Sequence, residues 1–251
     1  MDSLLAEAFA PGPAPTVLLD HLSGPVDCAF LLYHFLGAAL DGAAAAGAAS
    51  PPPATALIAT QQAPAHHRAL LRKCLGPARG DAVALVCAHE AHRRAGASPS
   101  PEALAGALLA AASGGSGAAP RLALAVEDVQ GLCELAGGAA QGLAVLRHLA
   151  GAQPRALLLR APGAACEWLL DGGCGLLVAP TLGTALEQWA RTLLLGRDLP
   201  SGFSKDAHGR LELWRRPAEG AAGGEGGLAH CRAALFRVGT DGTVTDPSTS
   251  F

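Results

Sequence analysis

The chain has 251 residues, a formal net charge of −3 and 50% hydrophobic residues, many of them alanine. This length suits one large α/β domain or two small ones, and the slight negative charge excludes a globally basic nucleic-acid-binding protein. Glycine and proline, at 32 and 18 residues, cluster in loops. Such clustering indicates a folded core with low-complexity insertions rather than a disordered chain.

The first predicted elements are a buried strand at 16–19, a turn at 20–25 and a helix from about Asp27, which is a suitable N-cap. Few polar residues interrupt this helix as far as Leu40, so we expect it to be largely buried. The elements predicted after it are, in chain order, a strand at 55–60, a helix at 64–75, a strand at 82–87, a helix at 101–112, a strand at 121–126, a helix ending near 149, and strands at 156–159, 175–179 and 191–195.

Near-continuous apolar strands that alternate with helices are typical of a parallel sheet covered on both faces. Segments 210–216 and 233–238 instead favour a β-hairpin. We therefore predict a single α/β domain over 1–251, with a mostly parallel sheet, helices on both faces and a hairpin-rich C-terminal edge. Low-complexity insertions are expected near 41–54, 95–101, 111–120 and 218–228.

The location of the protein is predicted from signals that the sequence lacks. The N-terminus carries Asp2 and Glu7 without an early Lys or Arg, unlike a signal peptide. No run of about 18 strongly apolar residues is present. The seven cysteines contain no CxxC pair, so we expect reduced, mostly buried thiols and no structural disulfide. A soluble intracellular protein without membrane contact is the expectation.

The turn DHLSGPVDCAF follows the first strand, where a nucleotide-binding α/β protein carries its phosphate loop. Such a loop needs glycines whose N–H groups approach phosphates, a Lys, and a Ser or Thr for Mg²⁺. Here Gly24 is followed by Pro25, which has no N–H, and Asp27 would repel a phosphate. We therefore expect neither a bound nucleotide nor catalysis, and no cofactor.

Glu127 and Asp128 end the predicted strand at 121–126, where an ATPase holds its Mg²⁺-linked acid. Without the Lys and hydroxyl partners, we favour the interpretation that Asp128 caps the following helix. His89, Glu90 and His92 resemble a zinc-protease pattern, but the two histidines are three rather than four residues apart. We interpret them as loop residues at a strand end, and no metal site is predicted.

Two basic segments are candidates for contact with RNA phosphates. His66, His67, Arg68, Arg72 and Lys73 make the helix at 64–75 locally basic, although a solvated helix face is the favoured interpretation. In 210–216, strand alternation places Leu211, Leu213 and Arg215 on one face and Glu212, Trp214 and Arg216 on the other. Trp214 can stack on a base, or it can cover an interface or the sheet end, which is the favoured role.

The stretch LPSGFSKDAHGRLELWRRP, 199–217, resembles a signature of the Elongator complex protein 6 family. The helix Phe30-Leu31-Leu32-Tyr33-His34-Phe35-Leu36 is similar to the first helix of that family, and the strand order between the two segments also fits. The resemblance implies a RecA-like fold whose nucleotide motifs are degenerate, as the turn at 20–28 is here.

The resemblance also implies a function. Members of this family join Elongator proteins 4 and 5 in a hetero-hexameric ring, which docks on the catalytic Elongator core and supports modification of the wobble uridine in tRNA. The ring is associated with tRNA binding and release, in the cytoplasm and also the nucleus. A non-catalytic ring subunit that contacts tRNA through the assembled ring is therefore expected.

Candidate functional residues follow from this family. Those expected to face tRNA are Lys205, Arg210, Arg215 and Arg216, and those expected at subunit interfaces are Phe203, Leu213, Trp214 and Phe236. Two alternatives stay open: an active RecA-type ATPase with an unorthodox loop, and a scaffold that makes no RNA contact.

Overall fold

A computed structural model describes residues 2–10, 15–22, 27–45, 54–114, 122–163, 181–199, 207–217, 227–239 and 244–245. The strands are β1 (Thr16–His21), β2 (Thr55–Ala59), β3 (Ala84–Cys87), β4 (Ala123–Val126), β5 (Ala156–Pro162), β6 (Thr192–Arg197), β7 (Gly209–Arg215), β8 (Ala229–Val238) and β9 (Val244–Thr245). They form one nine-stranded sheet in the order β3-β2-β4-β5-β1-β6-β7-β8-β9. The predicted strand at 175–179 lies outside the described residues.

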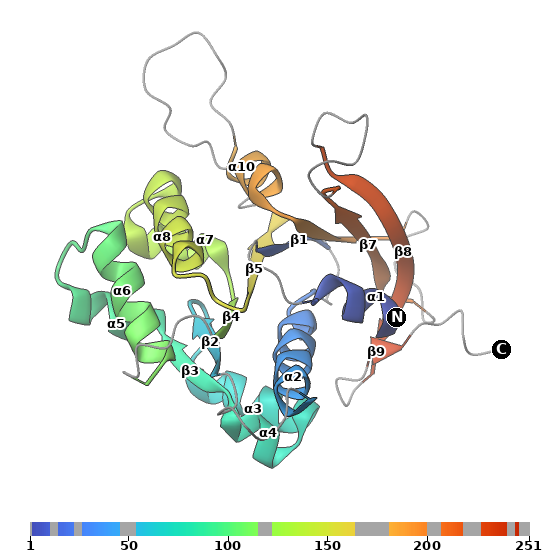
Figure 1. Cartoon of the computed structure of the whole chain (residues 1–251), viewed down its shortest axis with the longest axis horizontal. Helices are drawn as coiled ribbons and strands as arrows, with labels where there is room; N and C mark the ends of the chain where they lie inside the picture. Colours follow the sequence, from blue (N-terminus) through green and yellow to red (C-terminus); the bar gives the residue numbers. More distant parts are fainter. Residues whose placement is uncertain are drawn as a thin grey trace, which may run out of the picture.

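The sheet changes character along its width. Strands β3 to β6 in this order are parallel, and β6, β7, β8 and β9 are joined by antiparallel pairings. β1, β2 and β4 are almost wholly buried, as expected for parallel strands covered on both faces. The predicted sheet, with its hairpin-rich C-terminal edge, is confirmed (Figure 1).

Helices cover both faces of the sheet, as predicted (Figure 1). One face carries α1 (Asp2–Ala8), α2 (Phe30–Ala45), α3 (Pro64–Leu75) and α4 (Pro77–Ala82). The opposite face carries α5 (Ala88–Ala95), α6 (Pro101–Ala112), α7 (Val129–Ala136), α8 (Ala139–Gly151) and α10 (Leu182–Trp189). α2 is largely buried, because apolar residues surround nearly its whole circumference as far as Leu36.

Several elements differ from the prediction. The helix expected to run to 149 is two helices, because Gly137 and Gly138 adopt φ of 92° and 135°, which end α7 before α8 begins. α1, α4, α5 and α10 were not predicted, since each has only six to eight residues and too few turns for a clear apolar period. α2 continues to Ala45, so part of the expected 41–54 connector is helical.

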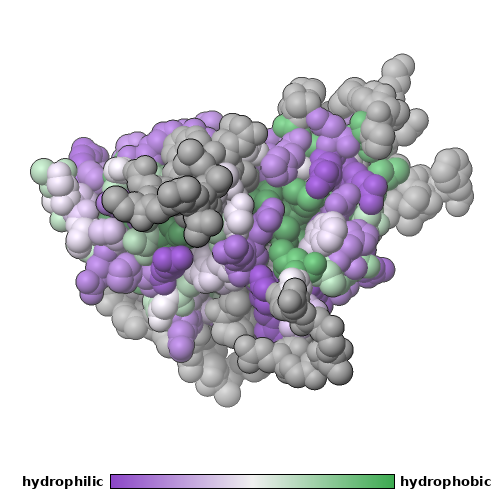
Figure 2. Space-filling view, turned by 90° about the horizontal axis from the view of Figure 1, so that it is seen from above, coloured by the Kyte–Doolittle hydropathy of each residue, from purple (hydrophilic) through white to green (hydrophobic). Residues whose placement is uncertain are grey.

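On the face seen from above, hydrophilic residues border a hydrophobic strip right of centre (Figure 2). Among the described residues, Leu235 is the one large hydrophobic side chain that is clearly exposed, at 38%. The five cysteines that the structure describes are free thiols. Within the described ranges, no helix has both the length and the apolar character to cross a bilayer.

Candidate functional site

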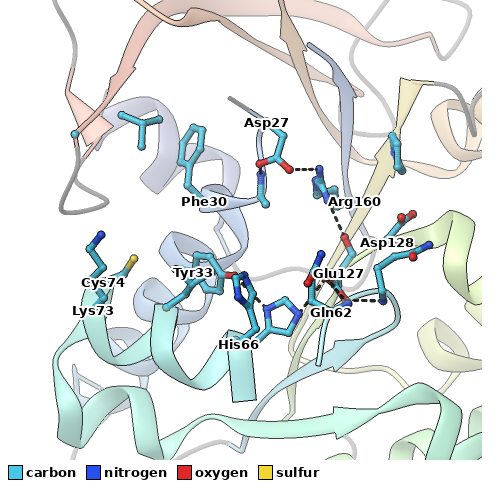
Figure 3. Close-up of a pocket in the computed structure, with 17 residues that line it drawn as sticks. Asp27, Phe30, Tyr33, Gln62, His66, Lys73, Cys74, Glu127, Asp128 and Arg160 are labelled. Carbon is cyan, nitrogen blue, oxygen red and sulfur yellow. Dashed lines mark hydrogen bonds and ion pairs between the residues drawn. The ribbon is translucent and has the colours of Figure 1, made fainter. Parts of the chain in front are cut away.

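A cavity of about 610 Å³ lies at the carboxyl ends of the parallel strands, between α2 and α3 (Figure 3). Its walls include Asp27, Phe30 and Tyr33 from the start of α2, and Glu127 and Arg160 from the ends of β4 and β5. The edge where parallel strands end is the usual ligand position in open α/β sheets, because the strand order reverses there and leaves a crevice. The cavity is therefore the first place to look for a nucleotide site.

Glu127 forms the floor of this cavity, and the chain itself uses both of its carboxylate oxygens. The backbone N–H groups of Thr60 and Gln61 donate to Oε2 at 2.8 and 2.9 Å, and that of Gln62 donates to Oε1 at 3.2 Å. Nε2 of His67 lies 3.1 Å from Oε1. Burial alone would raise the pKa of Glu127, but the contacts from His67 and these amides outweigh it and lower the pKa to about 2. Glu127 is thus a structural carboxylate that fixes the β2–α3 turn.

The buried imidazole of His67 continues this network into α2. Its Nδ1 is hydrogen-bonded to the hydroxyl of Tyr33 at 3.1 Å, so Tyr33, His67 and Glu127 join α2, α3 and the end of β4 (Figure 3). Burial, and next the charge of Glu127, raise the pKa of the Tyr33 hydroxyl. A phenol held protonated in this way is a hydrogen-bond donor rather than a nucleophile.

Two carboxylates and one guanidinium occupy the start of α2. Nη2 of Arg160 lies 2.9 Å from an oxygen of Asp20 and 2.9 Å from an oxygen of Asp27. Asp20 also accepts from the Cys28 N–H at 2.8 Å, and Asp27 accepts from the Ala29 N–H at 3.0 Å. Burial lowers the pKa of Arg160, but Asp27 and Asp20 together raise it by more.

These contacts involve backbone N–H groups at the start of α2. In a phosphate-binding α/β protein, the N–H groups at the start of the helix face the ligand phosphates. Here the N–H groups of Cys28 and Ala29 donate to carboxylates of the chain, and those carboxylates repel a phosphate. The sequence-based expectation that Asp27 lies near this position agrees with the structure.

Asp128 caps α7, as favoured from the sequence: its Oδ1 accepts from the Gln130 N–H at 2.7 Å. Burial raises the pKa of this carboxyl despite that hydrogen bond. His89, Glu90 and His92 do not lie in a loop as predicted, because α5 begins directly after β3. No group of three or more potential metal ligands occurs in the part of the chain that the structure describes.

The basic helix at 64–75 is α3, and three of its five basic side chains make contacts within the fold. His67 is buried in the network with Glu127, and Arg68 donates to the Gly80 carbonyl. Arg72 makes a two-point contact with Asp81 at 2.8 and 3.1 Å. These contacts attach α3 to α4, so the helix is more than a solvated face.

The predicted tRNA-facing residues do not form one cluster. Arg215 binds the Glu7 carboxylate at 3.0 Å and the Glu7 carbonyl, so it fastens α1 to β7. Arg216 donates to the carbonyls of Gln188 at 2.8 Å and Glu187 at 3.3 Å near the end of α10. Arg210 lies at the other end of β7, 3.2 Å from Glu212. Lys205 is outside the described residues.

The predicted interface residues also lie in different environments. Leu213 and Phe236 are fully buried within the chain, and Phe236 packs on Phe30 with ring centroids 5.3 Å apart. In contrast to the expectation, neither side chain offers a surface to a partner, because β7 and β8 turn them toward the α1–α2 side of the sheet. Trp214 is half-buried on the opposite face, against His230, and Phe203 is outside the described residues.

The residues that connect the site, Arg160, Tyr33 and His67, were not predicted as such from the sequence. Arg160 is the single charged residue within an apolar strand, a signal that could have marked it as the partner of a buried acid. Tyr33 and His67 are polar residues at positions that the helical period buries, which carries the same signal. Their actual partners are distant in sequence, so pairing them requires the fold.

The comparisons with known proteins show the fold of the chain and no more than the fold. No family model matches the sequence, and no curated protein matches it either. A crystal structure of a KaiC-like protein from the hyperthermophilic archaeon Pyrococcus horikoshii OT3 is similar, with a TM-score of 0.51 and 11% sequence identity. The match covers 93% of this chain and 89% of the archaeal chain. At this identity the likeness concerns architecture alone, and it shows that the chain has a RecA-like fold of the KaiC type.

Proposed function

We propose that this protein is a non-catalytic, RecA-like subunit of the Elongator accessory ring, which assembles with Elongator proteins 4 and 5 and supports wobble-uridine modification of tRNA. The observation that carries the proposal is the arrangement at the start of α2. Asp20 and Asp27, fixed by Arg160, accept the N–H groups that a phosphate would need. A RecA-like domain with this turn keeps the shape of a ring subunit without the means to hold ATP.

Two further observations support the proposal. The signature at 199–217 and the helix that begins at Phe30 resemble the Elongator protein 6 family. In addition, Glu127, which follows β4 where an ATPase needs an acid for Mg²⁺, has its oxygens engaged by three backbone N–H groups and His67. An acid used in this way is a poor partner for Mg²⁺–ATP, because binding the metal would release buried donors.

The alternative of an active ATPase makes the opposite prediction for nucleotide binding. We expect the isolated chain to bind no Mg²⁺–ATP at millimolar nucleotide when followed by calorimetry, and to hydrolyse none. Turnover that disappears in Asp128→Asn would favour the ATPase, because Asn still caps α7 but lacks the charge for Mg²⁺. The other alternative, a scaffold without RNA contact, predicts that the chain does not bind tRNA.

The assembly itself is tested by the native mass of this chain co-expressed with Elongator proteins 4 and 5. A six-chain species that contains all three proteins is expected. If the two partners assemble while this chain stays a monomer, the proposed function is wrong.

A further inference from the structure

A row of side chains crosses four strands at one end of the sheet. The register places His21 of β1 opposite Arg197 of β6, Arg197 opposite Arg210 of β7, and Arg210 opposite Leu235 of β8. We name these four residues the arginine row, after the two arginines at its centre, Arg197 and Arg210. Arg237, two positions beyond Leu235 on β8, extends the row on the same face by strand alternation.

The side chains of the arginine row lie on the same side of the sheet as α5–α8 and α10. Leu195 belongs to the core under α5–α8 and α10, so Arg197, two positions later, points to that same side. Phe236 faces the opposite core, which likewise places Leu235 on the side of Arg197. The side chains of Arg197 and Arg210 are 58% and 42% exposed. No described helix therefore covers this end of β6, β7 and β8.

The charges in the row are unevenly balanced. Like charges directly opposite each other on neighbouring strands destabilise a sheet, yet Arg197 and Arg210 occupy such positions. Both guanidinium groups share one carboxylate, that of Glu212, at 3.8 and 3.2 Å. Asp198 follows Arg197 and is a second acid, whereas Arg237 is a third guanidinium. Three arginines therefore face two acids, an excess of one positive charge, although the buried Glu212 carboxylate needs one of these cations for folding.

We propose that the arginine row binds phosphate groups of an RNA backbone. Guanidinium groups are the side chains best matched to phosphate oxygens, and such contacts contribute affinity without reading sequence. Trp214 lies on the same face of β7, beyond Glu212, and is half-buried: its Nε1 donates to Glu212 at 3.3 Å, and its ring lies 4.9 Å from that of His230, centroid to centroid. The remaining exposed part of the ring is what an unpaired base could stack on. An acidic protein would use the arginines but would gain less from the aromatic ring.

This inference rests on the proposed function for its choice of RNA, and it changes which residues carry the contact. Arg215 and Arg216 already bind Glu7 and the carbonyls at the end of α10. Recruiting them to RNA would break those contacts. Arg197 and Arg210 contact the buried Glu212 through Nε, so their Nη groups can reach a phosphate while that contact is kept.

The test is binding of fluorescent tRNA to the isolated full chain over a series of salt concentrations. The double variant Arg197→Gln, Arg210→Gln is compared with Arg93→Gln, Arg94→Gln, which removes the same charge from α5 next to the opposite edge strand, β3. We expect the row variant to lose about tenfold in affinity and to reduce the salt slope by about 2, as for two lost phosphate contacts. The α5 variant should change affinity less than about twofold.

Equal losses in both variants, or none in either, would overturn the inference. Unchanged tRNA binding together with lost binding of poly-glutamate would also overturn it and would indicate an acidic protein as the partner. Should the double variant unfold, Arg197→Gln alone tests the same point, with an expected loss of about threefold. Ring assembly is measured separately by native mass, so failure of the proposed function and failure of the RNA contact give different results.

Discussion

The start of α2 and the arginine row are two charged regions at the same end of the sheet, built in opposite ways. At the start of α2, Arg160 neutralises Asp20 and Asp27, and nearby backbone N–H groups complete the hydrogen bonding of both acids. In the arginine row, two guanidinium groups share a single carboxylate and stay largely exposed. Charge that is fully paired within the chain thus fixes the fold, whereas exposed charge in excess of its partners is available to a ligand.

The largest effect on the free energy of unfolding is expected when Arg160 is removed. Arg160→Ala leaves Asp20 charged, buried and without its main partner, so we expect a loss of about 3–5 kcal/mol in the free energy of unfolding. Urea denaturation measures this loss. A loss below about 1 kcal/mol would mean that solvent already screens the three charges.

Glu127→Gln removes the charge of the neighbouring carboxylate, and it should lower the free energy of unfolding slightly less than Arg160→Ala does. A glutamine amide in place of one oxygen faces backbone donors, and we expect a loss of about 2–3 kcal/mol at pH 7. Glu134→Gln, on the exposed side of α7, is the matched control and should be nearly neutral.

The same carboxylate predicts a dependence of stability on pH. The folded pKa of Glu127, about 2, lies below its ordinary value of 4.5. Its contribution, about 3 kcal/mol, is therefore complete above pH 4.5 and is lost as the pH falls through 2. The difference in unfolding free energy between wild type and Glu127→Gln should narrow over this window. A constant difference would contradict the assignment.

Loss of the Asp128 cap of α7 should lower the free energy of unfolding by a smaller amount. Asp128→Ala removes the acceptor for the Gln130 N–H and should cost about 1 kcal/mol in thermal or urea unfolding, whereas Asp128→Asn should retain most of the stability. Equal losses for both variants would show that the charge near Arg160, rather than the cap, is what matters.

The smallest change in unfolding free energy is expected in the arginine row, in contrast to the large change expected for Arg160. Arg197→Gln removes a repulsion with Arg210 and a long contact with Glu212, so its unfolding free energy should stay within about 0.5 kcal/mol of wild type. A loss similar to that of Arg160→Ala would make Arg197 a structural residue and would weaken its role in binding RNA.

The sequence predicted the parts of the fold that depend on local pattern. Apolar runs located β1, β2, β4 and β6, and Pro64 and Pro101 open helices at the expected residues. The site was harder to predict, because its contacts join residues such as Asp20 and Arg160 that are 140 positions apart. Charge and motif rules identify Asp27 as unfavourable for phosphate, but they cannot tell which residue neutralises it.

The position of β1 in the sheet has a consequence for synthesis of the chain. β1 precedes both of its described partners, β5 and β6, which end at Pro162 and Arg197. At about 5–20 residues per second, its apolar residues wait roughly 10–30 s on a ribosome before both partners exist. During that interval the nascent chain exposes a strand with two unpaired edges, which is a substrate for chaperones and a hazard for aggregation. Pairing of the central strand is therefore completed only after β6 has been synthesised.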